Sequence, residues 1–280
     1  MRLGIAQFAV REERPEESRA AQRSVVRSLF GDGAQLIILP ECTSHKYGLG
    51  SLDEVEQLAE PLDGETVRAW SEWARESRGY LVGGMLERHG KSYFNTAVLV
   101  GPHGYLGHYR KVHRFGWERI WLEAGDELVL FRIRSLDVNL GVLICYDLRF
   151  SEAVRSLAVA GADVLAVPTT WTSIGKTVLW DEQGYAPQDH LALGHAYANR
   201  LFVACADRVG QEADVTYLGA SLVAGPGGEA LMGPFAGRHP DSGVVDVDIA
   251  SARDKRIGSS HLWQDRRWVF DVPVRLVEVS

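Results

Sequence analysis

The sequence predicts an α/β fold built on mixed β-sheets. Short apolar runs of strand length recur along the chain, and amphipathic stretches of helical length lie between several of them. Strands that alternate with helices favour layers in which helices cover a sheet. A Gly-Pro-His-Gly turn at 101–104 joins two apolar runs, 93–100 and 105–109, and predicts a hairpin. The hairpin requires an antiparallel pair, so we expect the sheets to be mixed.

The other elements follow from local signals along the chain. A helix is expected over 15–30, because it starts at a proline, which suits the first turn of a helix. Ser151 is placed to cap a second helix that runs to about Ala160, with Gly161 ending it. A third helix is expected over 191–200. The expected strands, in chain order, are 3–9, 35–39, 138–144, 163–167, 220–224 and 243–249.

The chain is interpreted as one domain that spans residues 1–280. No stretch of linker composition, short repeat or low-complexity sequence divides it. Three irregular segments, 40–50, 110–126 and 170–190, are rich in Trp, Tyr, Gly and charged residues. Because long loops in compact domains are often functional, we look for a site in these segments.

Composition argues against several classes of function. The formal net charge of −7 disfavours general nucleic-acid binding, which needs clustered Lys and Arg. The three cysteines, Cys42, Cys145 and Cys205, have neither disulfide nor zinc-site spacing and favour a reducing compartment. No apolar window has membrane-spanning length, and the amino terminus lacks the pattern of a signal peptide. We expect a cytoplasmic protein that binds neither nucleic acid nor a membrane.

Cys145 is the first candidate for chemistry. It ends the apolar run Val-Asn-Leu-Gly-Val-Leu-Ile and precedes an expected helix, so it lies at a strand-to-helix turn. A thiol in that position can attack a carbonyl carbon, and the backbone N–H of Tyr146 can hold the resulting oxyanion. A buried structural cysteine is the alternative interpretation, because free cysteine packs well as a small hydrophobic residue.

Glu41 and Lys111 are the charged candidates. Glu41 follows the expected strand 35–39 and so lies at the edge where ligands of open α/β sheets collect. A carboxylate partly removed from water has a raised pKa, which suits a group that takes a thiol proton and later returns it. Lys111 follows the expected hairpin and can stabilise the negative charge of an acyl-transfer transition state. Taken alone, each is also typical of a solvated surface residue.

The loops also supply a second acid and several aromatic side chains. Glu118 lies between Trp117 and Trp121, which can bury its carboxylate or form a substrate wall. Four aromatic residues are candidates for the walls of a substrate pocket, with aromatic core as the alternative: Tyr47, Trp117, Tyr146 and Trp171.

Signatures of other hydrolases are absent from the sequence. None of the nine histidines pairs with another at His-x-x-x-His spacing, and there is no Gly-x-Ser-x-Gly turn. The Gly-Pro-Gly-Gly segment at 225–228 lacks the surroundings of a nucleotide-binding loop. We therefore expect no metal and no organic cofactor.

The candidate residues lie in three short motifs that occur in a fixed order: Leu-Pro-Glu ending at Glu41, Tyr-Arg-Lys-Val-His around Lys111, and Ile-Cys-Tyr-Asp-Leu-Arg-Phe around Cys145. This pattern resembles the nitrilase superfamily of carbon–nitrogen hydrolases. The similarity extends from the Ala-Gln-Phe near the start, through the segments at 94–100, 123–127 and 161–171, to the segment 219–231. It covers nearly the whole chain.

The resemblance implies a role for each motif residue. Glu41 matches the general base, Lys111 the catalytic lysine, Cys145 the nucleophile and Glu118 the second, substrate-orienting glutamate. The implied fold is a four-layer αββα sandwich with two mixed β-sheets. Family members are usually dimerised by helices near the active site, so a homodimer or larger assembly is expected, with a C-terminal tail of about 255–280 packing on the partner subunit.

The implied reaction is cysteine-dependent hydrolysis of a non-peptide C–N bond. A small amide that releases ammonia through a thioester is the first choice of substrate. The segment 172–195 is longer than in many simple amidases, and His195-Ala196 stands where many relatives have Arg-Ala. Its Gln-Asp-His-Leu keeps N-carbamoyl amino acids open as the alternative. Nitrile hydrolysis, acyl transfer to an acceptor other than water, and a binding module without activity are further alternatives.

Overall fold

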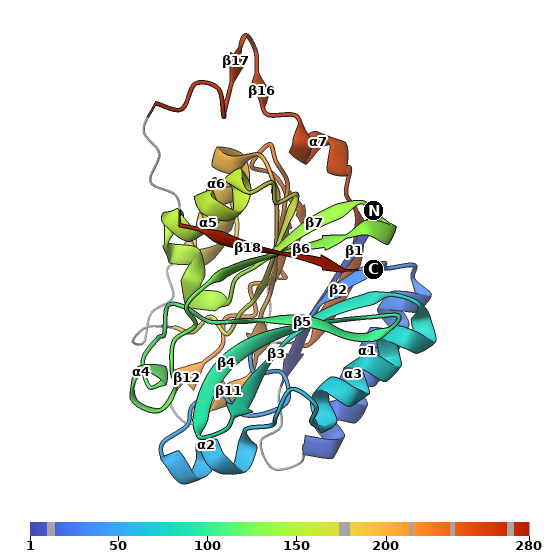
Figure 1. Ribbon diagram of the computed structural model, residues 1–280, viewed down its shortest axis with the longest axis vertical. Coiled ribbons are helices and arrows are strands. Elements are labelled where there is room, and N and C mark those ends of the chain that lie inside the picture. The colour runs from blue at the N-terminus through green and yellow to red at the C-terminus, as the bar shows by residue number, and fades with distance from the viewer. Residues whose placement is uncertain (10–14, 174–179, 213–214, 236–238, 268–271, 280) are drawn as a thin grey trace.

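The computed structural model describes residues 1–9, 15–173, 180–212, 215–235, 239–267 and 272–279 (Figure 1). Its first seven-stranded sheet has the order β10-β1-β2-β3-β4-β5, and β15 also pairs with β1. β2 runs parallel to β1 and β3, whereas β4 runs antiparallel to both of its neighbours, β3 and β5. The strands of this sheet are β1 (Arg2–Ala9), β2 (Leu36–Ile38), β3 (Tyr80–His89), β4 (Ser92–Gly101), β5 (Gly104–Arg110), β10 (Arg208–Val209) and β15 (Asp241–Asp246).

The second seven-stranded sheet has the order β14-β13-β9-β8-β7-β6-β18. β7, β8 and β9 are parallel, and antiparallel strands flank them on both sides. Its strands are β6 (Leu128–Ile133), β7 (Val138–Val142), β8 (Val164–Pro168), β9 (Phe202–Ala206), β13 (Leu222–Ala224), β14 (Ala230–Met232) and β18 (Val274–Val279). Two small antiparallel pairs are formed by β11 (Gln211–Glu212) with β12 (Val215–Thr216), and by β16 (Arg256–Ile257) with β17 (Ser260–His261).

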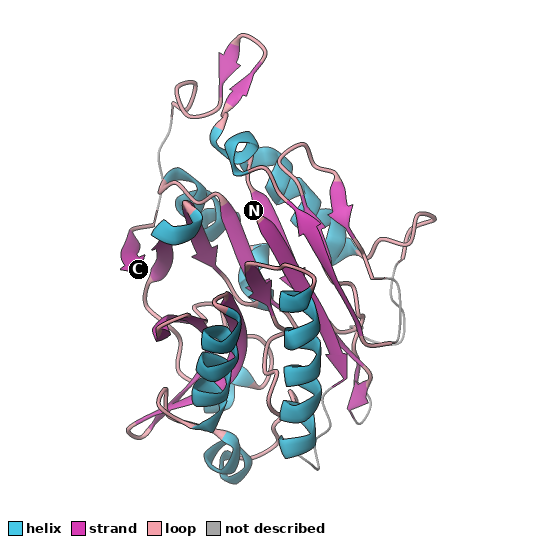
Figure 2. Ribbon diagram, turned by 90° about the vertical axis from the view of Figure 1, so that its right-hand side faces the viewer, coloured by secondary structure: helices cyan, strands magenta, loops and turns pink. Residues whose placement is uncertain are grey.

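Helices cover the outer faces of the two sheets, which face each other (Figures 1 and 2). α1 and α3 pack on the first sheet, and α5 and α6 pack on the second. The helices are α1 (Pro15–Gly31), α2 (Leu52–Leu58), α3 (Glu65–Ser77), α4 (Glu118–Trp121), α5 (Ser151–Val159), α6 (Pro187–Asn199) and α7 (Ile249–Arg253). This arrangement confirms the predicted four-layer αββα sandwich with two mixed β-sheets. None of the helices in the described part of the chain has the length and apolar character needed to cross a membrane.

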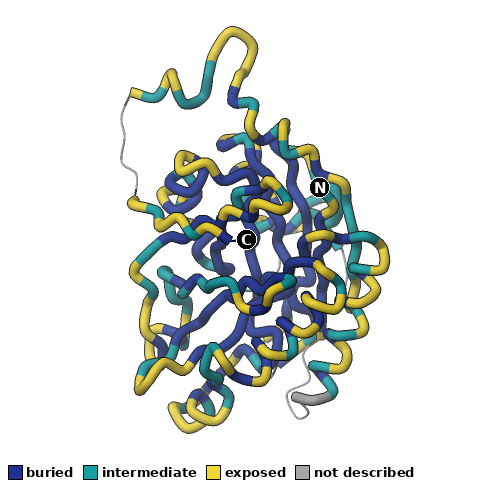
Figure 3. The backbone as a smooth tube through the Cα atoms, turned by 45° about the vertical axis from the view of Figure 1, so that its right-hand side comes forward, coloured by how far each residue is buried: buried dark blue, intermediate teal, exposed yellow. Residues whose placement is uncertain are grey.

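The burial of β2 shows why its sequence is apolar without interruption. Leu36 and Ile38 face the second sheet, in the large core between the two sheets. Ile37 and Leu39 face the opposite way, into the core that α1 and α3 share with the first sheet. A strand covered on both faces needs apolar side chains at every position, because successive residues point to opposite faces. The inner strands β1, β2, β8 and β9 are accordingly buried along most of their length, and buried chain fills the centre of the molecule (Figure 3).

Most of the predicted elements are present, with shifted ends. The helix expected over 15–30, the hairpin at 93–109 and the strands near 3–9, 36–38, 138–142 and 164–167 all form. Gly161 ends α5 with a φ of +100°, a backbone conformation that glycine adopts without strain. The third helix begins earlier than expected, at Pro187, because Asp189 accepts a hydrogen bond from the backbone N–H of Ala186 at 2.8 Å.

Two local predictions were wrong. Ser151 does not cap α5: it is the first residue of the helix, and Phe150 occupies the cap position without a side-chain hydrogen bond. The reason is that a 3₁₀ turn over Cys145–Arg149 leads directly into α5. The strand expected over 243–249 ends at Asp246, since Asp248 caps α7 by accepting from the backbone N–H of Ala250.

Gly84 in β3 supports the backbone that carries Glu41. A Cβ atom at Gly84 would lie 2.6 Å from the Cα of Glu41 and 2.8 Å from the N of Cys42. The backbone of Gly84 also accepts from Thr43 N at 2.9 Å and donates to Pro40 O at 3.1 Å. The strand and the turn after β2 are therefore in direct backbone contact.

We predict that Gly84→Ala lowers the free energy of unfolding by about 1–3 kcal/mol, because the added methyl overpacks a site that only backbone atoms surround. Urea denaturation measures the change. Gly194→Ala is the matched control: nothing lies within 4 Å of a Cβ atom there, inside α6. It should raise the free energy of unfolding by about 0.5–1 kcal/mol through helix propensity. Equal stability of Gly84→Ala and wild type would contradict the packing described.

Candidate active site

Glu41, Lys111 and Cys145 come together where strands of the two sheets end. Glu41 follows β2 and Lys111 follows β5, both in the first sheet, whereas Cys145 follows β7 in the second. The backbone of Glu41 joins the sheets, because its N–H donates to Thr169 O and its carbonyl accepts from Thr170 Oγ1, both at 3.3 Å. Glu118, the first residue of α4, completes the group.

The ammonium group of Lys111 lies between two buried carboxylates. Its Nζ donates to Oε1 of Glu41 and to Oε1 of Glu118, at 2.8 Å in each case, and all three side chains are fully buried. Burial opposes the charge on Lys111, but the two carboxylates outweigh it and raise the pKa of Lys111 well above its ordinary value. The lysine is therefore a fixed positive charge at neutral pH.

Glu118 is held from several directions. Its Oε1 also accepts from Asn95 Nδ2 at 2.9 Å and from the hydroxyl of Tyr47 at 3.1 Å. Its Oε2 accepts from the backbone N–H of Phe115 at 2.8 Å. Burial raises the pKa of Glu118, Lys111 lowers it in part, and the charge of Glu41 raises it again.

One oxygen of Glu41 is left without a donor. Oε1 accepts from Asn95 Nδ2 at 2.7 Å and from Lys111, whereas Oε2 is buried and accepts no hydrogen bond from any described residue. A buried carboxylate oxygen without a partner is costly, so its presence points to a function. Such an oxygen can accept a proton from a neighbouring acidic group.

Cys145 lies on a strained turn that buried hydrogen bonds hold in place. Its φ is +46°, in the left-handed region that non-glycine residues seldom adopt. Asp147 accepts from the backbone N–H of Ile144 at 3.0 Å and from the hydroxyl of Tyr109 at 2.8 Å. Its other oxygen accepts from the backbone N–H of His113 at 2.9 Å. Asp147 thereby ties the cysteine turn to the segment that follows Lys111.

The Cys145 thiol is protonated at neutral pH. Burial and the charge of Glu41 raise its pKa well above the ordinary value, while Lys111 and a backbone hydrogen bond from Thr170 offset part of that rise. A thiol of this kind needs a base before it can act as a nucleophile.

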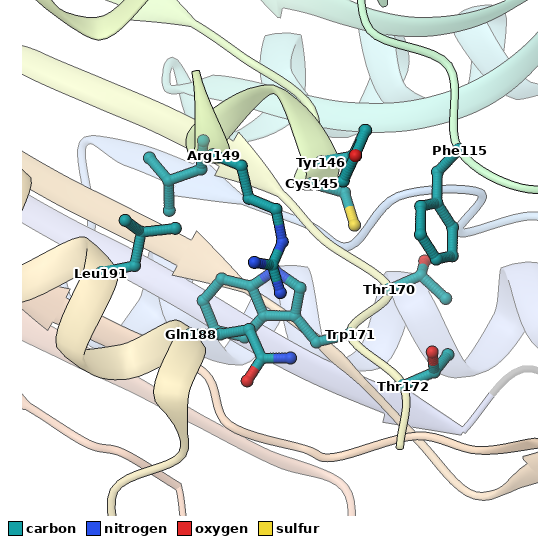
Figure 4. Close-up of a pocket in the computed structure, with 10 residues that line it drawn as sticks. Phe115, Cys145, Tyr146, Arg149, Thr170, Trp171, Thr172, Gln188 and Leu191 are labelled. Atoms are coloured by element: carbon teal, nitrogen blue, oxygen red, sulfur yellow. The ribbon is translucent and has the colours of Figure 1, made fainter. Parts of the chain in front are cut away.

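A pocket opens over Cys145 (Figure 4). Two of the four aromatic candidates, Tyr146 and Trp171, line it. The side chain of Arg149 points into the space above Trp171, beside Gln188 (Figure 4). The lining residues are Phe115, Cys145, Tyr146, Leu148, Arg149, Thr170, Trp171, Thr172, Gln188 and Leu191.

The other two aromatic candidates line a neighbouring cavity instead. Tyr47 and Trp117 pack edge to face with ring centroids 5.6 Å apart, and both border this second space. Phe115 and Thr172 are common to both cavities. Tyr47 nevertheless reaches the charged cluster through its hydrogen bond to Glu118.

Sequence reasoning missed Asn95, Asp147 and Arg149. Asn95 was visible as a lone amide in an apolar strand, and the other two lie within the cysteine motif. The unusual His195 lies in α6, where its Nε2 is 2.8 Å from Leu148 O and holds the helix against the cysteine turn. Within the long segment 172–195, residues 174–179 lie outside the described residues. Among the residues that are described, no group of three or more His, Cys, Asp or Glu side chains could hold a metal ion.

Comparison with known proteins identifies the family. The carbon–nitrogen hydrolase family model matches residues 2–256. The chain belongs to the carbon–nitrogen hydrolase family. This confirms the resemblance seen in the three motifs, and cysteine-dependent hydrolysis of C–N bonds is the activity of this carbon–nitrogen hydrolase.

Individual relatives of this carbon–nitrogen hydrolase are amidases and a nitrilase. It is 34% identical to a nitrilase of Pyrococcus abyssi, over 90% of this chain and 92% of that protein. It is 31% identical to an omega-amidase of Danio rerio, over 91% of each. The structure of an amidase from Nesterenkonia AN1 superimposes with a TM-score of 0.74 and 27% identity, over 91% of this chain and 94% of that one.

Proposed function

We propose that this carbon–nitrogen hydrolase cleaves small primary amides to a carboxylic acid and ammonia through a thioester on Cys145. The observation that supports this most directly is the unpaired Oε2 of Glu41, in the same buried cluster as Lys111 and next to a protonated thiol. Base, fixed positive charge and nucleophile are the three groups that acyl transfer to a cysteine requires.

In the proposed first half-reaction, Glu41 Oε2 takes the thiol proton as the sulfur of Cys145 attacks the amide carbon. Lys111 Nζ and the backbone N–H of Tyr146 stabilise the negative oxygen of the tetrahedral intermediate. Glu41 then passes its proton to the amide nitrogen, the C–N bond breaks, and ammonia leaves a thioester behind. Glu118 serves as the second carboxylate that fixes the position of Lys111.

The second half-reaction uses the same groups. Water gives a proton to Glu41 and adds to the thioester carbon, and Lys111 again stabilises the oxyanion. The C–S bond breaks, the thiolate of Cys145 recovers its proton, and the carboxylic acid leaves.

The relatives support an amide as substrate. Two of those described above are named as amidases. Two other structures show variants of the Nesterenkonia enzyme, one in complex with acrylamide and one with the acetamide moiety of fluoroacetamide added covalently at the active-site cysteine. These names do not favour the alternative of N-carbamoyl amino acids.

Arg149 supports a narrower substrate class, amides that carry a carboxylate. Its side chain is exposed, points into the Cys145 pocket (Figure 4) and makes no ion pair or hydrogen bond with a described residue. A guanidinium group binds a carboxylate through two parallel hydrogen bonds. We therefore propose that Arg149 receives the acid group at the far end of the substrate.

The assembly and the location of the enzyme also remain proposals. We propose one domain over 1–280 that forms a homodimer or larger assembly in the cytoplasm. The pair β16–β17 stands away from the body of the molecule (Figure 1). In the same C-terminal segment, Ile257 and Leu276 are 50% and 54% exposed. β18 pairs with β6 of the same chain, so this part of the C-terminal segment belongs to the second sheet. Within 255–280, we propose that the β16–β17 pair and the outer face of β18 contact the partner subunit. A monomeric mass by light scattering, or recovery of the enzyme outside the cytoplasm, would overturn these assignments.

The nucleophile and base are tested by variants assayed for ammonia release from small amides, N-carbamoyl amino acids and nitriles. Cys145→Ala should lower the rate on amides by more than about a thousandfold, since the covalent route is lost. Glu41→Gln should lower it by about 10²–10⁴-fold, because the amide cannot take the proton. Cys205→Ala is the control. Because Cys205 is a buried residue of β9 outside the charged cluster, this variant should retain its activity. Near-normal turnover by Cys145→Ala would refute the assignment, and carbon dioxide released with ammonia would restore the carbamoyl alternative.

The role of Arg149 is tested with a monoamide of a dicarboxylic acid and a neutral amide of equal length. Arg149→Met should lower kcat/KM for the acidic amide by about 10–100-fold, the value of a lost charge-assisted hydrogen bond. It should change kcat/KM for the neutral amide less than about threefold, and Arg149→Lys should retain part of the preference. An equal loss on both substrates would show that Arg149 does not bind a carboxylate.

A further inference from the structure

The loop 42–48, which directly follows Glu41, is held by a buried ion pair from a distant part of the chain. Arg208 begins β10 and Glu212 lies in β11, and Arg208 Nη2 donates to Glu212 Oε1. Arg208 is 0% exposed and Glu212 8%. Neither residue lies in one of the three sequence motifs.

Each member of the pair binds a different part of the loop. Nη1 of Arg208 donates to the carbonyl of Cys42 at 3.4 Å and to that of His45 at 3.1 Å. Oε2 of Glu212 accepts from the backbone N–H of Tyr47 at 2.8 Å and from that of Gly48 at 3.1 Å. The pair thus fixes both the start and the end of the loop through its backbone.

The stability of the fold does not by itself explain why the buried pair against the loop 42–48 is charged. Removing two charges from water is costly, and apolar residues of similar size often stabilise a fold as well or better. A guanidinium fork and a carboxylate do, however, define the positions of four backbone groups more sharply than apolar contacts. The guanidinium also lies over the ring of Tyr217 at 4.9 Å, which restricts it further.

The loop transmits this constraint to the charged cluster through one side chain. The hydroxyl of Tyr47 donates to Oε1 of Glu118, the same oxygen that accepts from Lys111. A displacement of the loop would therefore alter the hydrogen bonding of the carboxylate that fixes Lys111.

We infer that Arg208 and Glu212 are positioning residues for hydrolysis, which act through Tyr47 to keep Glu118 and Lys111 aligned with Cys145. This inference rests on the proposed function. It assigns no contact with the substrate to either residue, so the effect should fall on kcat more than on KM.

The test is a double-mutant cycle with Tyr47→Phe. Arg208→Lys and Glu212→Gln should each lower kcat for a small amide about tenfold in the wild-type background, and less than about twofold in the Tyr47→Phe background, because groups that act through one contact are not additive. Arg253→Lys is the control, since Arg253 pairs with Asp163 and Asp137 away from the site. It should leave kcat unchanged in both backgrounds. Glu212→Gln keeps an acceptor for the loop and provides the test if Arg208→Lys does not fold.

A second measurement separates this inference from the proposed function. The rate at which iodoacetamide alkylates Cys145, with Cys145→Ala as the blank for the other thiols, needs no turnover. Arg208→Lys and Glu212→Gln should change this rate and its pH profile, and Tyr47→Phe should cancel most of the change. If the wild type hydrolyses no amide but this coupling is present, the proposed function fails and the positioning role stands. The positioning role would be overturned if Arg208→Lys or Glu212→Gln lowered kcat by the same factor with and without Tyr47→Phe. It would also be overturned if these variants lost thermal stability while kcat and the alkylation rate stayed unchanged.

Discussion

The ammonium group of Lys111 between Glu41 and Glu118 is the interaction on which the candidate site depends. Three fully buried charged side chains are stable only while each keeps its partners. Their positions come from the ends of β2 and β5 and the start of α4, and Asn95 of β4 bridges the two carboxylates. The first sheet therefore has to be in register for the cluster to form at all. Burying these charges costs free energy, but the ion pairs and hydrogen bonds inside the cluster hold the three side chains in fixed positions, which exposed side chains do not keep.

The second sheet adds the thiol and the walls of the pocket. β7 presents Cys145, and the segment after β8 supplies Thr170 and Trp171. Asp207, which follows β9, is fully buried and accepts from the backbone N–H groups of Trp171 at 2.8 Å and Ala220 at 3.0 Å. Burial raises the pKa of Asp207 to about 6, since these donors compensate only in part. The candidate catalytic groups thus come from separate sheets, and the packing of the sheets sets the distance between them.

The sequence alone predicted the fold class. It also singled out Glu41, Lys111 and Glu118, which the structure joins in one buried cluster, and Cys145, which lies beside them. Strand periodicity located most of the central strands. The three motifs predicted roles for Glu41, Lys111 and Cys145, and the family resemblance added Glu118. The supporting contacts were out of reach, because they join residues far apart in the chain. Asn95 meets Glu41 across 54 positions and Arg208 meets His45 across 163, and no local pattern encodes such a pair. Ser151 was misplaced for a related reason: its capping signal is local, whereas the preceding 3₁₀ turn depends on the buried Asp147.

The left-handed backbone at Cys145 limits which side chains could take the place of the proposed nucleophile. A β-branched side chain is strained at a φ of +46°, whereas an unbranched one is tolerated. Serine and cysteine are therefore interchangeable in shape at this turn, but threonine is not. The route from a cysteine hydrolase to a threonine hydrolase on this scaffold is obstructed by the backbone before the reactivity of the hydroxyl group comes into question.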